Sequence, residues 1–467
     1  MPVPKYHQRR FHTNSKKHKK VPETAEDFLE AGIEFEESGD RWKAGDRQKA
    51  ARFYRRAIEQ YEQCLKIDST QFDAAYNKAR LEYKLTQEPE MCTKLELLPL
   101  LETALKSHME VLGIERENLD AIFNTAQVHT SLAEQLTDLE KPRAVSLLNT
   151  ACQLFQEVLS KQRAKFASYS SVDAIDTEAG GVSLAGVDDM MIDDDAETSA
   201  QTPSSTKDET DDNEEYAHIE VPVTESTILD THLEFLATLC TLLPLNPSPS
   251  LLQTTSDILT STQSFSTSLP DRAKEITLTS YQVHLAAAEC QFRLGMHTAA
   301  DWAATISKAF PTGLKTAEAY SIKSDAHITL ASEVSEMAFA HLSFASAALK
   351  EASKIQQTAG NVYLAWGDVE LMRSRVAPEA HRITLKKNAG VYYRAAMKLG
   401  DATEKFEAMT KEAFLKWGEG GGTELLRSKA AQEVIAEAVE EGVIDRDEAV
   451  CLAGVLRAQK EGMMAEV

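Results

Sequence analysis

Apolar residues recur along most of this chain at intervals of three and four positions, the spacing that places them on one face of an α-helix. No sustained alternation of apolar and polar residues, which a half-buried β-strand requires, interrupts this pattern. Strong helix formers such as alanine, leucine, glutamate, lysine and glutamine dominate these stretches. We therefore predict an all-α fold. The predicted helices span 24–38, 46–66, 71–85, 93–112, 117–136, 141–161, 224–243, 249–265, 270–294, 298–309, 313–332, 335–357, 360–374, 380–399, 402–416, 424–441 and 445–461.

Charged residues are distributed unevenly. The 467-residue chain has 50 lysines and arginines against 73 aspartates and glutamates, a net charge of −23. Residues 1–22 carry seven basic residues and no acidic one, whereas residues 172–215 hold fifteen acids and a single lysine. Segments so charged and so poor in apolar residues cannot bury enough surface to offset their ordering entropy. We therefore predict a basic disordered tail and an acidic disordered linker.

Small and aromatic residues recur at a fixed spacing in the predicted helices. One example is Ala50, Tyr54 and Ala57, and the same spacing returns far along the chain. Small residues let two antiparallel helices approach closely, and an aromatic ring fills the space between one hairpin and the next. A generic helical bundle is the alternative source of such spacing. The residues that we expect to pack the hairpins are Phe28, Gly32, Phe35, Ala50, Tyr54, Ala57, Tyr76, Tyr83, Ala144, Ala151, Trp366, Gly367, Ala389, Tyr393 and Ala396.

This pattern resembles the tetratricopeptide repeat (TPR) family in a degenerate form. The resemblance is clearest over 25–85, moderate over 117–160 and 313–400, and weak over 224–310. The proline that normally closes each repeat is missing. The resemblance implies a solenoid of helical hairpins that offers a groove to a peptide or protein segment.

A subset of the family holds the C-terminal carboxylate of heat-shock chaperones in a clamp of lysine, asparagine and arginine. The resemblance places the corresponding positions of this chain in the first helices of its repeats, and the residues there do not form such a clamp. These positions are Leu29, Ile33, Lys78, Ala121 and Thr125.

The charged segments and the repeats together predict five parts. The interruption of the solenoid by the acidic linker is the main feature of this organisation. The parts are a basic disordered tail (1–22), N-terminal TPR-like repeats (23–166), the acidic disordered linker (167–222), C-terminal TPR-like repeats (223–416), and a glycine joint followed by a C-terminal helical pair (417–467).

Signals of catalysis, metal binding and membrane insertion are missing from the sequence. There is no zinc-protease, nucleophile-elbow or P-loop motif, and the six cysteines form no C-x-x-C pair. The glycines at 418–422 precede a predicted helix without a strand before them, so we expect a flexible joint and not an anion site. No apolar run approaches the length of a membrane span, and no secretory signal begins the chain. We predict a non-enzymatic protein with no catalytic residues, cofactor, metal or membrane partner.

Two functions agree with these features. The first is a protein-binding module, such as an acidic chaperone or escort for a basic client like a ribosomal protein, which the negative charge would attract. The alternative is a scaffold subunit that bridges partners within a larger complex. Because nucleic acids bind positive surfaces, we expect no direct contact between nucleic acid and the folded body.

The basic tail contains the cluster Lys16, Lys17, Lys19 and Lys20, which fits a short nuclear import signal. The alternatives are an arm that touches ribosomal RNA or the acidic linker, and a mitochondrial presequence. A presequence needs an amphipathic helix, which early prolines and a lysine cluster disfavour. We therefore predict a protein of the nucleus and cytoplasm.

Overall fold

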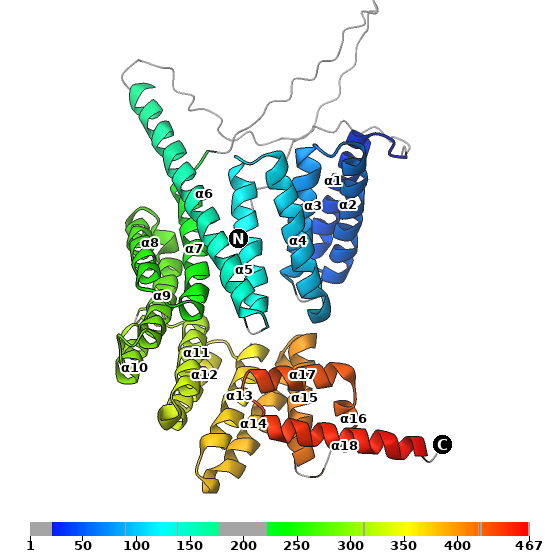
Figure 1. Ribbon diagram of the computed structural model, residues 1–467, viewed down its shortest axis with the longest axis vertical. Helices are drawn as coiled ribbons and strands as arrows, with labels where there is room; N and C mark the ends of the chain where they lie inside the picture. The colour runs from blue at the N-terminus through cyan, green and yellow to red at the C-terminus, as the bar shows by residue number, and fades with distance from the viewer. Residues whose placement is uncertain are drawn as a thin grey trace, which may run out of the picture.

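The structure is a computed structural model that describes residues 21–176 and 222–465, except 89, 138, 312, 419, 421 and 422. Every regular element in these ranges is a helix, so the predicted all-α fold is confirmed (Figure 1). Most of the predicted basic tail, with the lysine cluster, and the predicted linker from 177 to 221 lie outside the described residues.

The first part of the chain forms consecutive helical hairpins. Its last helix continues beyond residue 167, where the sequence predicts the linker to begin. The helices are α1 (Ala25–Lys43), α2 (Arg47–Ile67), α3 (Phe72–Thr86), α4 (Lys94–Ile114), α5 (Leu119–Leu136) and α6 (Lys141–Asp176).

The second part continues in the same manner, with two short 3₁₀ turns before α9 and α12. The elements are α7 (Glu225–Leu245), α8 (Pro249–Ser268), η1 (Pro270–Arg272), α9 (Ala273–Arg293), α10 (Ala299–Lys308), α11 (Ala317–Glu333), η2 (Ser335–Met337), α12 (Ala338–Ile355), α13 (Gly360–Val376), α14 (Glu379–Leu399), α15 (Ala402–Gly418), α16 (Thr423–Leu426), α17 (Lys429–Glu440) and α18 (Arg446–Ala465).

Helices that follow one another in the sequence also pack against one another. The pairs α1–α2, α3–α4, α5–α6, α11–α12 and α13–α14 form hairpins, and the second helix of one hairpin contacts the first helix of the next. The array curves from the blue N-terminal hairpin to the red C-terminal helices in Figure 1. Such nearest-neighbour packing defines a solenoid, and it confirms the predicted degenerate TPR-like array.

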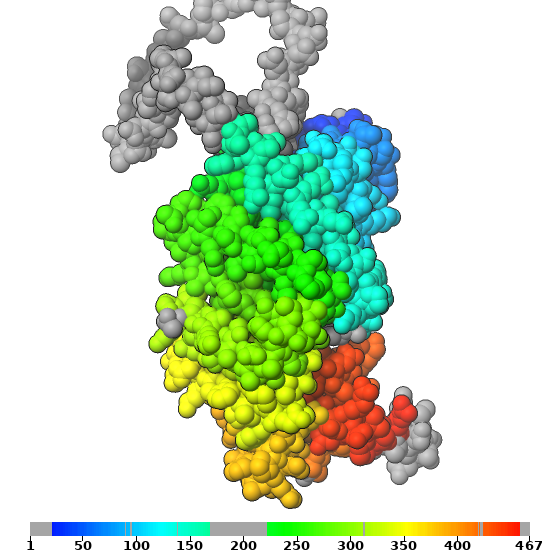
Figure 2. All heavy atoms as spheres, turned by 60° about the vertical axis from the view of Figure 1, so that its left-hand side comes forward, coloured from blue at the N-terminus to red at the C-terminus, as the bar shows by residue number. Residues whose placement is uncertain are grey.

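The hairpins on the two sides of segment 177–221 share one hydrophobic core. The ring of Phe155 on α6 stacks on that of Phe235 on α7, with centroids 6.0 Å apart. The hydroxyls of Thr130 on α5 and Thr238 on α7 are hydrogen-bonded at 2.9 Å. Figure 2 accordingly shows the cyan and green helices as one continuous body. The acidic segment therefore joins two helices that are neighbours in the array.

We expected no segment long and apolar enough to span a membrane, and helix α7 contradicts this expectation. Glu225–Leu245 is long and apolar enough by length and composition to do so. However, 61% of its most apolar window is buried inside the protein, where α7 packs against α6, α8 and α9. A core helix with neighbours on several sides is apolar all round, and this position explains the composition of α7.

Local sequence signals determine where several helices begin. Thr24, Thr93 and Thr298 each precede a helix and form a capping box with the acidic residue three positions later. In this arrangement the threonine side chain and the acidic side chain each bond a backbone N–H that the helix leaves free. These caps explain why the predicted starts of α1, α4 and α10 lie within one residue of the observed ones.

The glycine-rich stretch separates α15 from the C-terminal helices. Helix α15 ends at Gly418, and Gly420 has a φ of +97°, a left-handed conformation that favours glycine. The short helix α16, which the sequence analysis did not separate from α17, follows at Thr423.

Candidate protein-binding surface

Glycine and tyrosine bring the helices of the first hairpin together. In the structure the ring of Tyr54 lies against Gly39, and Gly32 lies against Tyr61. Both glycines are buried in α1, so each tyrosine occupies the space that a side chain would fill.

The corresponding contact in α13 and α14 joins Gly367 to Tyr393. A Cβ added to Gly367 would lie 2.5 Å from the Tyr393 ring. The adjacent Trp366 stacks on Tyr392 with centroids 4.0 Å apart, and its indole N–H donates to Ser346 Oγ at 2.9 Å. These contacts connect α12, α13 and α14.

The remaining hairpin-packing residues lie in or beside the core. Tyr76 is buried, and its hydroxyl accepts a hydrogen bond from Asn124 Nδ2 at 3.0 Å. Phe28 and Phe35 are partly buried against the N-terminal core, and Tyr83 is partly buried at α3. The six alanines are fully buried: Ala50, Ala57, Ala144, Ala151, Ala389 and Ala396.

Buried and partly buried polar groups link three successive helices near the N-terminal end. The Tyr54 hydroxyl donates to Asp40 Oδ1 at 2.8 Å, and Lys84 Nζ of α3 donates to the same oxygen at 2.6 Å. A tyrosine, a carboxylate and a lysine thus connect α2, α1 and α3. Since each member has a partner, the cluster is suited to holding the helices together.

The same chemistry recurs near the other end of the array. Tyr393 donates to Asp368 Oδ1 at 2.8 Å, and Lys411 Nζ donates to Asp368 Oδ2 at 2.9 Å. Lys411 is 1% exposed and also pairs with Glu407 at 2.7 Å. Burial lowers the pKa of Lys411, but the two carboxylates outweigh it and raise this pKa above its ordinary value. Lys411 therefore stays charged in the core.

The positions that correspond to the chaperone clamp do not form a polar site. Ala121 and Thr125 are fully buried, and Leu29 is buried in the N-terminal core. Ile33 is partly buried against the same core, and Lys78 is engaged in an ion pair within α3. The repeat spacing therefore did not locate the accessible side of these first helices.

Contacts between α3, α5 and α7 bring carboxylates together on a surface that we call the α3–α5–α7 face, defined by Tyr83, Glu134 and Glu234. The Tyr83 hydroxyl is hydrogen-bonded to Ser131 Oγ of α5 at 2.9 Å. The negative charge of Glu234 on α7 raises the pKa of Glu134 on α5, and the charges of both glutamates contribute to the raised pKa of Tyr83. Gln127 donates to Glu234. No motif indicated these two glutamates, which lie far apart in the sequence.

The two glutamates lack a cationic partner among the described residues. Burial first, and then the charge of Glu234, raises the pKa of Glu134 above its usual range. Burial likewise raises the pKa of Glu234. Burial raises the pKa of Tyr83 to about 12. Glu134 is nevertheless exposed and Glu234 only half-buried, so a cation of a partner could reach the ionised carboxylates and stabilise them.

A third carboxylate in such a setting lies further along the array, on α11. Asp325 is solvent-exposed, yet removal from bulk water raises its pKa to about 6. No side-chain partner of Asp325 is present in the part of the chain that the structure describes.

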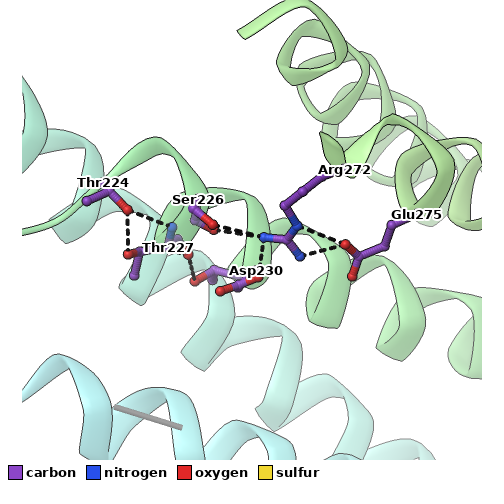
Figure 3. A network of polar contacts seen from close by, with 7 residues as sticks. Thr224, Ser226, Thr227, Asp230, Arg272 and Glu275 are labelled. Atoms are coloured by element: carbon purple, nitrogen blue, oxygen red, sulfur yellow. Dashed lines mark hydrogen bonds and ion pairs between the residues drawn. The ribbon is translucent and has the colours of Figure 1, made fainter. Parts of the chain in front are cut away.

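A polar network fixes the beginning of α7, directly after the acidic segment (Figure 3). The guanidinium of Arg272 bonds Asp230 Oδ1 at 2.5 Å and Glu275 Oε2 at 2.7 Å. It also donates to Ser226 Oγ at 3.2 Å, while Thr224 caps the helix. Unlike Glu234, the neighbouring Asp230 is therefore already neutralised.

Histidine side chains lie in the core between α4 and α5. His129 is 7% exposed, and neither ring nitrogen has a hydrogen-bond partner among the described residues. Burial lowers its pKa to about 4. His108 is also buried, and its Nδ1 bonds the Ala104 carbonyl at 2.8 Å. These histidines are neutral near pH 7.

Burial disfavours the reactive thiolate form of most of the cysteines. All six cysteines are free, and burial raises the pKa of Cys64 to about 11 and those of Cys152 and Cys240 to about 12. Within the described ranges, no three His, Cys, Asp or Glu side chains are grouped to hold a metal.

Comparison with known proteins gives short sequence matches. No protein-family model matches the chain. A UPF0656 protein of Schizosaccharomyces pombe is 39% identical over 82 residues, which are 18% of each chain. The uncharacterized protein YNL193W of Saccharomyces cerevisiae is 45% identical over 76 residues, 15% of this chain and 14% of that one. The matches thus span less than a fifth of either relative.

Two solved structures are similar over larger parts of the chain. The nuclear import adaptor Nro1 covers 82% of this chain and 93% of its own, with a TM-score of 0.30 and 11% identity. Yeast Tom70 covers 92% of this chain and 76% of its own, with a TM-score of 0.25 and 12% identity. At these scores the two structures carry no argument about function.

Proposed function

We propose that this protein is a non-enzymatic protein-binding array that holds a basic client, as an acidic chaperone or escort does, with a ribosomal protein as one such client. The observation that supports it most directly is the pair of carboxylates Glu134 and Glu234, which lie on the contacting helices α5 and α7 and have no cationic partner among the described residues. Solenoids of this kind offer extended surfaces for protein segments.

The physical basis of the proposal is the cost of ionising these carboxyl groups. Burial raises the pKa of both Glu134 and Glu234, and the charge of Glu234 raises the pKa of Glu134 further. A lysine or arginine of a client placed between Glu134 and Glu234 would stabilise both ionised forms. Binding would therefore release protons, and client affinity should rise with pH as the free carboxylates ionise.

The net charge of −23 adds a long-range contribution. It attracts basic partners and increases their rate of association, with an effect that salt screens over about 8 Å at physiological ionic strength. An escort that must capture a basic protein quickly benefits from both the general field and the local carboxylate pair.

The test is affinity purification with mass spectrometry at low and high salt, using the full chain. The double variant Glu134→Gln and Glu234→Gln should retain about tenfold less of its basic partners than the unchanged protein. The reason is that close charge pairs at an interface slow the dissociation of the complex. The control is Glu59→Gln with Glu336→Gln, which removes the same charge from exposed positions on α2 and η2. Equal retention by both variants would refute the proposal.

The same experiment addresses the alternative. Partners that remain bound at fixed stoichiometry in high salt, in both variants, would identify a scaffold subunit within a larger complex. Capture that depends on low salt and on Glu134 and Glu234 would identify an escort.

We also propose that the protein occupies the nucleus and the cytoplasm. This proposal is supported by the lysine cluster at 16–20, because exposed lysines close together in sequence can pair with acidic pockets of an import factor.

A further inference from the structure

Helix α14 has a charge opposite to that of the whole chain. In a protein of net charge −23, this helix contains five lysines and arginines and a single acidic residue, Glu379. It forms the yellow-orange hairpin with α13 near the lower end of Figure 1. The basic residues are Arg382, Lys386, Lys387, Arg394 and Lys398.

Basic and apolar side chains alternate along one exposed side of this helix. Ile383, Lys387, Val391, Arg394 and Lys398 follow one another at intervals of three and four positions, which places them on one face. All five are exposed, and Ile383 and Val391 retain 68% and 52% of their accessible surface. We call these five residues the α14 stripe.

Only some of the cations on α14 are already neutralised. Arg394 pairs with Glu412 at 2.9 Å, and Lys386 pairs with Glu448 at 3.3 Å. Within the described residues, Lys387 and Lys398 have no hydrogen bond or ion pair. Their charges are therefore available at the two sides of Val391, which lies between them on the stripe.

The stripe borders a shallow hollow between α13 and α14. The hollow has a volume of about 390 Å³. Apolar atoms of Tyr363, Val391, Ala395 and Leu399 form much of its lining, together with Arg394 and Lys398. A hollow with apolar walls and adjacent cations suits an apolar side chain that has a carboxylate beside it.

We propose that the α14 stripe is a docking site for an acidic protein segment in which apolar residues lie between carboxylates. The free cations at Lys387 and Lys398 would pair with the carboxylates, and the hollow would receive an apolar side chain. The α14 stripe is separate from the α3–α5–α7 face. It would bind acidic partners, whereas that face would bind basic ones.

The surroundings favour a protein segment over a phosphate polymer or an anionic membrane. The basic stripe is one helix wide, and the neighbouring helices α13 and α15 each carry equal numbers of acidic and basic residues, so they do not extend it into the broad positive surface that a polyanion requires. A phosphate backbone also has no apolar group to place against Val391 and Leu399. A segment of alternating acidic and apolar side chains satisfies both features of the stripe.

The test uses a short fluorescein-labelled peptide in which pairs of aspartates alternate with pairs of leucines, added to the full-length protein at low salt. Fluorescence anisotropy should show binding, and Lys387→Glu with Lys398→Glu should weaken it by about tenfold or more. Val391→Ser should weaken it as well. The control variant, Lys308→Glu with Lys350→Glu, makes the same charge change at exposed positions on α10 and α12 and should bind normally.

Altered peptides test whether charge and apolar contact both contribute to binding. Replacing the aspartates of the peptide by asparagine, or its leucines by serine, should each reduce binding, because the stripe offers both cations and an apolar surface. The proposal is overturned if the peptide does not bind at low salt, or if the Lys387 and Lys398 changes leave its binding intact. It is also overturned if phosphatidylserine vesicles or a single-stranded oligonucleotide bind the stripe more tightly than the peptide.

Discussion

Tyr393 lies against Gly367 and donates a hydrogen bond of 2.8 Å to the next residue, Asp368. One aromatic side chain therefore fills the space left by a missing Cβ and satisfies a buried carboxylate. The contact at the N-terminal end, between Tyr54, Gly39 and Asp40, has the same chemistry. Each hairpin depends on a glycine whose neighbour carries the acceptor for the opposing tyrosine.

The first prediction concerns this glycine. Gly367→Ala should lower the free energy of unfolding by about 1–3 kcal/mol, since the new methyl group would overlap the Tyr393 ring. Gly390→Ala on α14 is the matched control, because its nearest side-chain atom, Arg394 Nη1, lies 3.4 Å away on a flexible side chain. There the better helix propensity of alanine should add up to about 1 kcal/mol. Denaturant unfolding measures both, and equal effects would contradict the packing.

The second prediction concerns Lys411. Lys411→Met should lower the free energy of unfolding by about 3–5 kcal/mol, because it leaves Asp368 and Glu407 without their cation. The same change at Lys429, which is 84% exposed and pairs with Glu433, should cost less than about 0.5 kcal/mol. Denaturant unfolding of both variants provides the comparison. A cost at Lys411 as small as that at Lys429 would show that the buried cluster does not hold α13 to α15.

Helix positions followed well from the sequence, whereas local spacing does not specify which glycine of the first hairpin faces which tyrosine. The predicted helix 46–66 is observed as Arg47–Ile67, because its apolar spacing and flanking turn residues act locally. By contrast, Gly32 and Gly39 lie seven residues apart, as do Tyr54 and Tyr61. Either glycine could match either tyrosine in sequence. The short connection between α1 and α2 selects the observed pairs.

The candidate surfaces were less accessible to sequence reasoning for a physical reason. Glu134 and Glu234 approach one another only because α5 contacts α7, and no local spacing reports such a long-range contact. The α14 stripe does have a local signal, basic and apolar residues at helical intervals, but neighbouring helices decide which side of α14 is exposed. The sequence therefore predicted the sign of the charge on the body and not the places where charge is uncompensated.

The third prediction concerns His129. The pKa of this histidine is about 4 in the folded protein, compared with 6.5 as its ordinary value. As pH falls below about 6.5, the unfolded state takes up a proton that the folded state refuses until about pH 4, so stability is lost across this window and fully present above it. His129→Leu should therefore reduce the loss of unfolding free energy between pH 8 and pH 5 by about 2 kcal/mol.

Denaturant unfolding at the two pH values measures this effect. His284→Leu is the comparison variant, because it removes a histidine from an exposed position on α9 and leaves the core intact. An unaltered pH dependence for His129→Leu would show that a proton reaches the His129 ring without unfolding.

The last prediction concerns the lysine cluster of the basic tail, which lies outside the described residues. A fluorescent reporter fused to residues 1–22 should accumulate in the nucleus, and changing Lys16, Lys17, Lys19 and Lys20 to alanine should distribute it evenly, because import factors bind a compact group of positive charges. Changing Lys5, Arg9 and Arg10 to alanine removes charge from the same tail without touching the cluster and should leave the reporter nuclear. Imaging in living cells decides the outcome. An even distribution of the unchanged reporter would contradict the import signal, and accumulation in mitochondria would replace it with a presequence.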